Sequence, residues 1–434
     1  MVSRIKIEKT TGGSWRCRLL FLIMACGFLH SEGSPDRYES LRFEHLTSIH
    51  GLSNNTVYAI TQDEEGYIWI ATRDGLNKFD GQMMTSYYHR GKSGLPGNLV
   101  ERVILSSSGK LFIATQNGLC TYIKEKDLFK AVNFMGNSLG DPYQLIRLYS
   151  GDLLISSVEG LFQISSDTIV SKISPVPYRE ICEYKKGLIW CLWEDEIHLI
   201  NTEGEMIRKY SAARNNSGQL DLSAANIECI FKDSRDILWL GTKRDGLGYY
   251  DPESDRLIRL NLKPGVNQVE NNFIRVIFED NAGILWIGTE SGLYLFDVEK
   301  QKFSHYGQSF IPFEKGLNDK AIYSIFQSKD SQMWIGTYFG GVNYTNLVPT
   351  GFYNIYADGG QKKLSGNAVS EIIETSSKKL WIGTEDGGVN IYDPLSGSFE
   401  YLKNEPGNPN SLSSNNIHAF EEDAEGNILS LIHI

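Results

Sequence analysis

The stretch GYIWIATRDGLNKFD at residues 66–80 decides the fold, because the chain writes it again several times. Clear copies are GILWIGTESGLYLFD at residues 283–297 and KLWIGTEDGGVNIYD at residues 379–393. Neighbouring copies are 36 to 49 residues apart, and six of the eight tryptophans occupy the same repeat position. A repeat of this length predicts a propeller or a solenoid. Aligned on that position, the eight copies are centred on Trp69, Phe112, Leu154, Trp190, Trp239, Trp286, Trp334 and Trp381.

Each copy predicts four short strands. In the first copy they are NTVYAITQD (55–63), YIWIAT (67–72), LNKFD (76–80) and TSYYH (85–89). Tight turns separate them, and no helical period of 3.6 competes. Four strands in about 40 residues are typical of a propeller blade. We therefore predict an all-β protein made of four-stranded antiparallel blades, which agrees with 12% aromatic residues and 42 glycines.

The repeated residues are interpreted as structural. A tryptophan at this position would bury a large apolar surface between adjacent blades. Small residues two and three places later let neighbouring sheets approach closely. Such pairs are Ala71 and Thr72, Gly241 and Thr242, and Gly288 and Thr289.

The number of copies exceeds one seven-bladed ring. The first seven copies predict a complete seven-bladed propeller over residues 41–350, and the eighth opens a second, truncated propeller over residues 355–428. Between Val348 and Gly359 the chain holds a proline and two adjacent glycines, which suits a boundary. A single eight-bladed ring is the alternative, because rings of about four to eight blades are common.

The end of the chain departs from the repeat. Residues 413–428, SSNNIHAFEEDAEGNI, match residues 52–68 closely, yet Leu429 stands 48 residues after Trp381, where a tryptophan is due. LSLIHI is also the translation of a transposon adapter used in sequencing libraries. We therefore expect residues 429–434 to be adapter-encoded and the gene to continue beyond Ile428. A stop codon after Ile434 at the native locus would refute this.

Charge and the first residues point to export. The net charge of -11 and pI of about 5.3 disfavour nucleic-acid binding by this segment. Basic residues precede the apolar stretch from Leu19 to Leu29, which is too short to span a bilayer and suits the core of a signal peptide at residues 1–33. The alternatives are an uncleaved anchor and a lipoprotein cleavage site at Cys26.

Neither metal nor catalytic chemistry is predicted. The cysteines beyond the leader lack C-x-x-C spacing, and the eight histidines lack H-x-x-x-H spacing. The sequence has no P-loop. We expect no cofactor, no metal and no catalytic residue, and we interpret the cysteines as buried thiols, with a disulfide after export as the alternative. The four cysteines concerned are Cys120, Cys182, Cys191 and Cys229.

The order of the motif elements resembles a known family. A G-L-S-x-N-x-V strand, a D-x-x-G turn, W-I-G-T, a short G-L or G-G-V strand and a closing Tyr/Phe-Asp follow one another. GLSNNTVYAITQDEEGYIWIATRDGLNKFDG, residues 51–81, closely resembles the two-component regulator propeller repeat. The resemblance covers about residues 41–428. The copies around Leu154 and Trp190 depart from it because they lack W-I-G-T.

The resemblance implies the periplasmic sensor of a hybrid two-component histidine kinase, a type best known from gut Bacteroidetes. In that family a signal sequence, two seven-bladed propellers and an immunoglobulin-like domain precede a membrane helix, a kinase, a receiver and usually a helix-turn-helix module. The usual ligands are oligosaccharides released from complex polysaccharides. The resemblance thus implies phosphorelay signalling, inner-membrane attachment through the C-terminal region and a homodimer of the whole protein. Kinase activity is implied for the parent alone.

The candidate ligand-binding residues lie in the loops between the second and third strands. In a four-stranded meander these loops share a face with the loops that enter the first strands. Mixed charges, amides and exposed rings suit a sugar, and variable loops on a constant scaffold often carry function, although ordinary solvated turns are the alternative. The predicted residues are Arg73, Asp74, Gln116, Asn117, Glu159, Lys243, Arg244, Asp245, Glu290, Tyr338 and Phe339.

Two other functions compete with glycan sensing. A propeller enzyme, such as a lyase or glycosidase, would bring acids or histidines together at the channel. A protein-interaction scaffold would expose a broad apolar patch on one face of the ring.

Overall fold

The computed structural model describes residues 38, 41–89, 94–194, 196–211, 226–260, 273–309, 316–347, 355 and 363–432. The predicted signal peptide, with Cys26, lies outside the described residues. So does the predicted boundary segment, except for residue 355. The predicted adapter-encoded tail is described only to residue 432.

The described residues are all-β apart from two short 3-10 turns, η1 (Ser48–His50) and η3 (Lys124–Lys126). Most sheets are meanders of four consecutive antiparallel strands. The first is β2 (Val57–Gln62), β3 (Ile68–Thr72), β4 (Gly75–Phe79) and β5 (Met84–Tyr87). The second is β6 (Val100–Leu105), β7 (Leu111–Thr115), β8 (Gly118–Ile123), β9 (Leu128–Phe134) and β10 (Asn137–Ser138).

The third to sixth sheets repeat this order. The third is β11 (Pro142–Arg147), β12 (Leu153–Ser157), β13 (Gly160–Ser165) and β14 (Ile169–Ser174). The fourth is β15 (Glu180–Lys185), β16 (Leu188–Trp193), β17 (Glu196–Asn201) and β18 (Met206–Ser211). The fifth is β19 (Ile227–Lys232), β20 (Leu238–Thr242), β21 (Leu247–Asp251) and β22 (Arg256–Arg259). The sixth is β23 (Ile274–Glu279), β24 (Leu285–Thr289), β25 (Gly292–Asp297) and β26 (Lys302–Tyr306).

The seventh sheet takes its outer strand from the start of the chain. It contains β27 (Ile322–Gln327), β28 (Gln332–Thr337), β29 (Val342–Asn346) and β1 (Glu44–Leu46). β1 pairs antiparallel with β29, with Glu44 opposite Tyr344 and Leu46 opposite Val342. The sequence pattern did not predict this strand, because residues 41–46 carry no element of the repeat.

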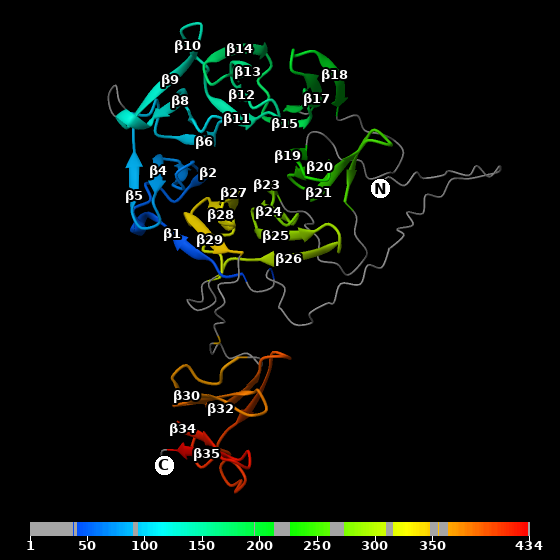
Figure 1. Cartoon of the computed structure of the whole chain (residues 1–434). Coiled ribbons are helices and arrows are strands. Elements are labelled where there is room, and N and C mark those ends of the chain that lie inside the picture. The colour runs from blue at the N-terminus through cyan, green and yellow to red at the C-terminus, as the bar shows by residue number, and fades with distance from the viewer. Residues whose placement is uncertain are drawn as a thin grey trace, which may run out of the picture.

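The seven sheets are arranged like propeller blades around a common centre. The first strand of each sheet lies innermost: β2, β6, β11, β15, β19, β23 and β27 (Figure 1). Each inner strand packs against the next in chain order, and β27 packs against β2. The first and seventh sheets also share a hydrophobic cluster that contains Val57, Ile70 and Trp334.

The repeated tryptophans lie between neighbouring sheets. Trp69 packs with Val100 and Ile113 of the second sheet, and Trp286 packs with Ile322 and Ile335 of the seventh. In the third sheet Leu154, which replaces the tryptophan, is fully buried. The third and fourth sheets are complete although their copies lack W-I-G-T.

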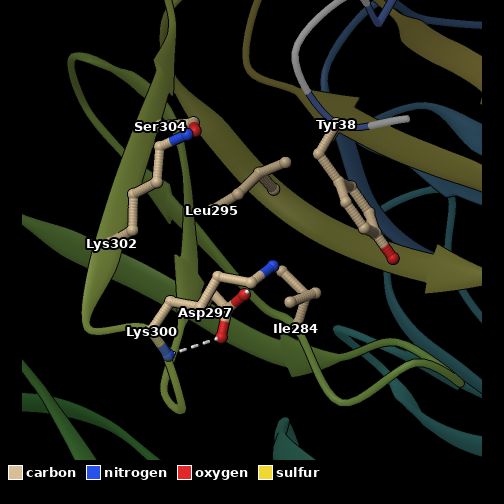
Figure 2. Close-up of a pocket in the computed structure, with 7 residues that line it drawn as sticks. All are labelled: Tyr38, Ile284, Leu295, Asp297, Lys300, Lys302 and Ser304. Atoms are coloured by element: carbon tan, nitrogen blue, oxygen red, sulfur yellow. Dashed lines mark hydrogen bonds and ion pairs between the residues drawn. The ribbon is translucent and has the colours of Figure 1, made fainter. Parts of the chain in front are cut away.

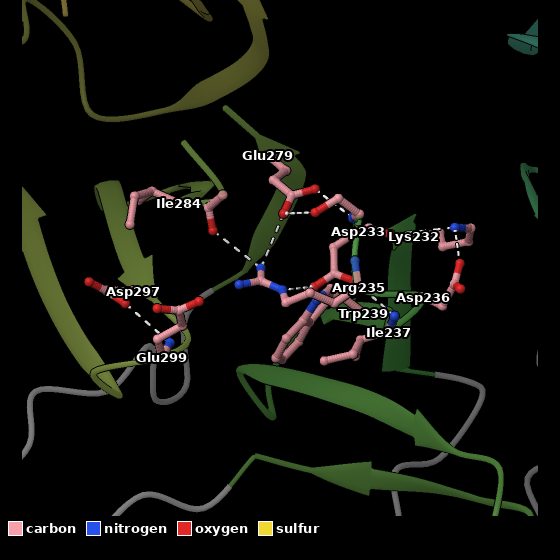
Figure 3. Close-up of polar contacts among 12 residues, drawn as sticks. Lys232, Asp233, Arg235, Asp236, Ile237, Trp239, Glu279, Ile284, Asp297 and Glu299 are labelled. Atoms are coloured by element: carbon pink, nitrogen blue, oxygen red, sulfur yellow. Dashed lines mark hydrogen bonds and ion pairs between the residues drawn. The ribbon is translucent and has the colours of Figure 1, made fainter. Parts of the chain in front are cut away.

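An aspartate six residues before the tryptophan holds the indole. Asp63, Asp233 and Asp280 accept a hydrogen bond from the indole Nε1–H of Trp69, Trp239 and Trp286 at 2.8, 3.0 and 2.9 Å. The other carboxylate oxygen accepts two backbone N–H groups of the turn that follows the aspartate. In the fifth sheet the same carboxylate also pairs with Arg235, which reaches Glu279 of the sixth sheet (Figure 3). In the fifth sheet the aspartate therefore joins the turn, the tryptophan and, through Arg235, the neighbouring sheet.

The seventh sheet lacks this aspartate, and we expect Ser328→Asp to stabilise the protein. Ser328 stands six residues before Trp334, whose buried Nε1–H has no partner among the described residues. A carboxylate there would satisfy this donor and add about 1 kcal/mol to the free energy of unfolding. Denaturant titration measures the gain. Ser328→Asn is the matched control: its single acceptor oxygen can serve the turn but not the indole as well, so a gain as large from this variant would contradict the explanation.

Glycines of the W-I-G-T segments are sites of close approach between sheets. A Cβ at Gly288 would lie 2.6 Å from Ile322 Cγ2, and one at Gly336 would lie 2.6 Å from Val57 Cγ1. Each contact is with the first residue of the next inner strand. These small residues therefore lie where neighbouring sheets touch, which is the role that the sequence predicted for them.

We expect Gly288→Ala to destabilise the protein by about 1 to 3 kcal/mol, because the added methyl group overpacks a closed interface. Equilibrium unfolding in denaturant measures the change. Gly307→Ala is the matched control, since a Cβ there meets its nearest atom at 3.7 Å. Equal stability of the two variants would show that the sheets can separate without cost.

Residues 363–432 form two further sheets. These are β30 (Val369–Glu374), β31 (Leu380–Thr384), β32 (Gly388–Asp393) and β33 (Ser398–Leu402), and the pair β34 (Ile417–Glu422) and β35 (Ile428–Ile432). They share their own hydrophobic cluster, which includes Val389, Ile417 and Phe420. Leu429, at the position where a tryptophan is due, is 59% exposed in β35. Whether residues 429–434 are adapter-encoded stays a prediction.

Candidate ligand-binding site

The predicted loops lie at the end of the sheets where the inner strands begin. The first residue of each loop donates its backbone N–H to the residue just before the inner strand. These bonds are Arg73 to Thr56, Gln116 to Leu99, Val158 to Asp141, Lys243 to Asn226, Glu290 to Phe273 and Tyr338 to Ala321, at 2.7 to 3.1 Å. The meander thus brings both sets of loops to one end, as the sequence predicted.

A polar chain crosses the second, third and fourth sheets on their inner strands. Arg102 Nε donates to Gln144 Oε1 at 2.9 Å, and Gln144 Nε2 donates to Glu180 Oε2 at 3.1 Å. Each residue comes from a different inner strand, β6, β11 and β15. The amide of Gln144 therefore connects a cation and an acid that lie two sheets apart.

Ion pairs continue this chain into the fifth and sixth sheets. Glu228 on β19 accepts from Arg179 Nη1 at 2.8 Å and lies 3.6 Å from Lys243 Nζ and from Arg275 Nη1. Arg275 on β23 donates its Nε–H to Glu290 Oε1 at 2.6 Å. We call the whole set the inner-strand network; its members are Glu101, Arg102, Gln144, Arg179, Glu180, Glu228, Lys243, Arg275 and Glu290.

Aromatic rings continue around the centre into the seventh and first sheets. Arg275 lies over the ring of Tyr323, 4.7 Å from its centroid. The Tyr323 ring is 6.1 Å from that of Tyr58 and 5.1 Å from that of Tyr338, which is 4.5 Å from Phe339. We call these four rings the aromatic shelf: Tyr58, Tyr323, Tyr338 and Phe339. Phe339 is 72% exposed, so the shelf presents an apolar ring to solvent.

Burial sets the electrostatics of the network. Desolvation raises the pKa of Glu180 to about 7, against the opposing effects of Arg102, the hydrogen bond from Gln144, and Arg179. Desolvation also raises the pKa of Glu101, while Arg102 opposes the shift. Burial on the inner strands therefore disfavours the ionised form of these two carboxyls.

The structure brings some predicted residues into this arrangement. Lys243 and Glu290 belong to the inner-strand network, and Tyr338 and Phe339 belong to the aromatic shelf. Arg73 interacts electrostatically with Tyr58 of the shelf.

Other predicted residues take part in their own turns. Asn117 Nδ2 donates to the carbonyl of Pro96 at 2.9 Å, and Asp245 accepts from Asn226 Nδ2 at 2.9 Å. Asp74 and Glu159 donate backbone N–H groups to hydroxyls of their own loops. Arg244 is exposed, and Gln116 buries an oxygen that has no partner among the described residues.

The prediction missed the residues on the inner strands, although the sequence holds a signal for them. The position equivalent to Tyr58 is charged or a tyrosine in all seven sheets. In register it is occupied by Tyr58, Glu101, Tyr143, Arg179, Glu228, Arg275 and Tyr323. A polar or aromatic residue at one fixed position of each inner strand indicates that these side chains line the centre of the seven sheets.

A small pocket lies elsewhere, on the outer strands of the sixth sheet. Figure 2 shows the side chains that line it: Tyr38, Ile284, Leu295, Asp297, Lys300, Lys302 and Ser304. Its charges are engaged, since Lys300 Nζ lies 3.0 Å from Asp297 Oδ2 and Tyr38 donates to Asp280 at 2.8 Å. None of the predicted loop residues lines this pocket, so it is separate from the predicted site.

Metal and membrane features were also sought within the described ranges. Those residues contain no group of three or more metal-ligating side chains. Their helices are too short or too polar to cross a membrane. The described thiols of Cys120, Cys182, Cys191 and Cys229 are free, and burial raises the pKa of each.

Comparison with known proteins supports the repeat assignment. The family described as two component regulator propeller matches residues 51–74, 268–291 and 316–339. A protein named histidine kinase P4 from Formosa agariphila is 51% identical over 45 residues, which are 10% of this chain and 3% of that protein.

Solved structures give the same fold. The extracellular domain of BT3049 from B. thetaiotaomicron, described as a hybrid two-component system, aligns with a TM-score of 0.70 at 24% identity, over 91% of this chain and 52% of that one. Virginiamycin B lyase from Staphylococcus aureus aligns with a TM-score of 0.52 at 15% identity, over 71% of this chain and 100% of that one. This chain thus spans about half the length of the BT3049 domain.

The sheets and their inner strands define a protein of the β-propeller class. The repeats within them are more specific, because three stretches of the chain match the two component regulator propeller family.

Proposed function

We propose that residues 44–346 close into a seven-bladed propeller and that residues 363–432 begin a second one. The proposal is supported by β1, which pairs with β29 and so ties the start of the chain to the seventh sheet. It is also supported by hydrogen bonds between these ends: Thr56 Oγ1 donates to the Tyr338 carbonyl at 2.6 Å, and Gly341 N–H donates to the Asn55 carbonyl at 2.9 Å. Shared strands of this kind remove an open edge.

The chain, on this proposal, is the extracytoplasmic ligand-sensing region of a hybrid two-component sensor histidine kinase. The observation that carries it is the inner-strand network beside the aromatic shelf, on a family scaffold whose relatives are named as a histidine kinase and a two-component system. Rings beside paired charges and amides suit an oligosaccharide, whose apolar faces stack and whose hydroxyls need donors and acceptors.

Signalling then depends on how the parts of the sensor region pack against one another. A bound oligosaccharide would favour one arrangement of the sensor region over another, and it can shift that equilibrium only by its differential affinity for the two. The whole protein would be a homodimer, exported and held in the inner membrane by its C-terminal region, and its kinase would read the change as phosphorelay.

The test uses the whole protein with added oligosaccharides. We expect a rise in the temperature of unfolding, because a ligand at 100 times its Kd stabilises the native state by about 2.7 kcal/mol. We also expect a change in the rate of autophosphorylation. If oligosaccharides of every class tested changed neither quantity, the proposal would be wrong.

The enzyme alternative has no specific observation in its favour. No histidine lies on the seven inner strands of the described sheets. The similarity to the lyase is one of fold alone, at 15% identity. On this proposal, the partners of the sensor are the oligosaccharide and a second copy of the same protein.

A further inference from the structure

Backbone hydrogen bonds hold the two outer rings of the aromatic shelf in place. Phe339 is 72% exposed, yet its backbone N–H is bound by Asp319 Oδ2 at 2.7 Å and its ring contacts Tyr338. Tyr338 is fixed in turn by its N–H bond to the Ala321 carbonyl at 3.0 Å. Preorganised rings that face solvent lose little entropy when a flat apolar surface stacks on them.

The charges beside the shelf are already neutralised by one another. Arg275, which lies over Tyr323, pairs with Glu290 and faces Glu228. Glu228 is shared further with Arg179 and Lys243. Of the cations in the inner-strand network, Arg179, Lys243 and Arg275 form ion pairs with carboxylates, whereas Arg102 donates to the Gln144 amide and the Glu101 carbonyl.

The pairing of charges beside the shelf favours a neutral sugar over an acidic one. A uronate or sulfate would need an arginine or lysine that is free to form a charge-assisted pair, and Arg275, the network cation over the shelf, would first have to leave Glu290. The hydroxyls of a neutral sugar need no such exchange, since the Arg275–Glu290 pair presents both donors and acceptors.

We infer that the shelf and the adjoining Arg275–Glu290 pair bind an uncharged oligosaccharide, with a pyranose face stacked on Tyr338 and Phe339. The inference rests on the proposed function and deepens it by naming the charge class of the ligand.

The test is calorimetric titration of the chain with two panels of oligosaccharides. One panel is neutral, from glucans, galactans and mannans; the other is acidic, from polygalacturonate and sulfated chondroitin. We expect binding within the neutral panel, and we expect Phe339→Ala and Tyr338→Ala each to weaken it about tenfold or more. Ile169→Ala, which removes another exposed apolar side chain at 64% exposure on β14, should leave the affinity unchanged.

Glu290→Gln tests the role of charge balance. It frees Arg275 from one partner, so we expect weaker binding of the neutral ligand and measurable binding of acidic fragments. Shelf-dependent binding of acidic fragments by the unmodified chain would overturn the inference and leave the proposed function standing. Neutral binding that the shelf variants do not weaken would overturn it as well. Failure of both panels to bind would overturn the inference and the proposed function together.

Discussion

Phe43→Ala should cost the protein about 3 to 5 kcal/mol of its free energy of unfolding, more than other single truncations near the chain ends. The Phe43 side chain is fully buried in the cluster that contains Trp286, Leu293 and Met333. Its ring meets that of Tyr306 edge to face at 5.9 Å. Truncation would leave a cavity between the sixth and seventh sheets and would weaken the anchor of β1 on β29.

The measurement is equilibrium unfolding in guanidinium chloride, followed by tryptophan fluorescence because Trp286 lies in the same cluster. Ile49→Ala is the matched control, since Ile49 is 87% exposed and its truncation should change stability by no more than about 0.5 kcal/mol. A loss below about 1 kcal/mol for Phe43→Ala would mean that the seventh sheet holds without the start of the chain.

The repeat predicts the sheets because it is local. Trp69 and the D-x-x-G turn before it lie within one hairpin, and the same letters produce the same hairpin in later copies. β1 was missed for the opposite reason. Its partner β29 lies about 300 residues further along the chain, and the EHL of β1 contains no turn signal or motif letter.

The role of the D-x-x-G aspartate was also only half predicted. The turn was expected, but the bond from Asp280 to the indole of Trp286 requires the hairpin to bring residues six positions apart together. A spacing of six between aspartate and tryptophan in three copies is a signal that could have shown it. In the incomplete repeat that begins at residue 413, Asp423 keeps its turn bonds, although residue 429, six positions later, is leucine.

The candidate site shows what loop variability alone can predict. It indicated the end of the sheets where the inner strands begin, and it named four residues that join the network or shelf: Lys243, Glu290, Tyr338 and Phe339. It could not show Arg275 or Glu228, because their side chains come together only when neighbouring inner strands converge. Stability and the proposed recognition therefore involve different residues: apolar ones between the sheets, and charged or aromatic ones toward the centre.

Glu180→Gln should raise the stability of the protein at neutral and alkaline pH. Desolvation raises the pKa of this carboxyl from 4.5 to about 7 in the folded protein. Between those values the folded state keeps a proton that the unfolded state releases, so the free energy of unfolding falls as the pH rises. The loss is complete above about pH 7 and is on the order of 1 to 3 kcal/mol, because the side chain is only partly covered.

Glutamine cannot ionise and still accepts the hydrogen bond from Gln144, so the variant should lack this slope and exceed the unmodified protein in stability at pH 8. Denaturant titrations at pH 5, 6, 7 and 8 measure both curves. Glu253→Gln, at an exposed turn of the fifth sheet, should leave the slope intact. If the Glu180→Gln curve ran parallel to that of the unmodified protein, the network would leave Glu180 charged across this range. The centre would then tolerate one more negative charge than its geometry implies, which would also weaken the case for a neutral ligand.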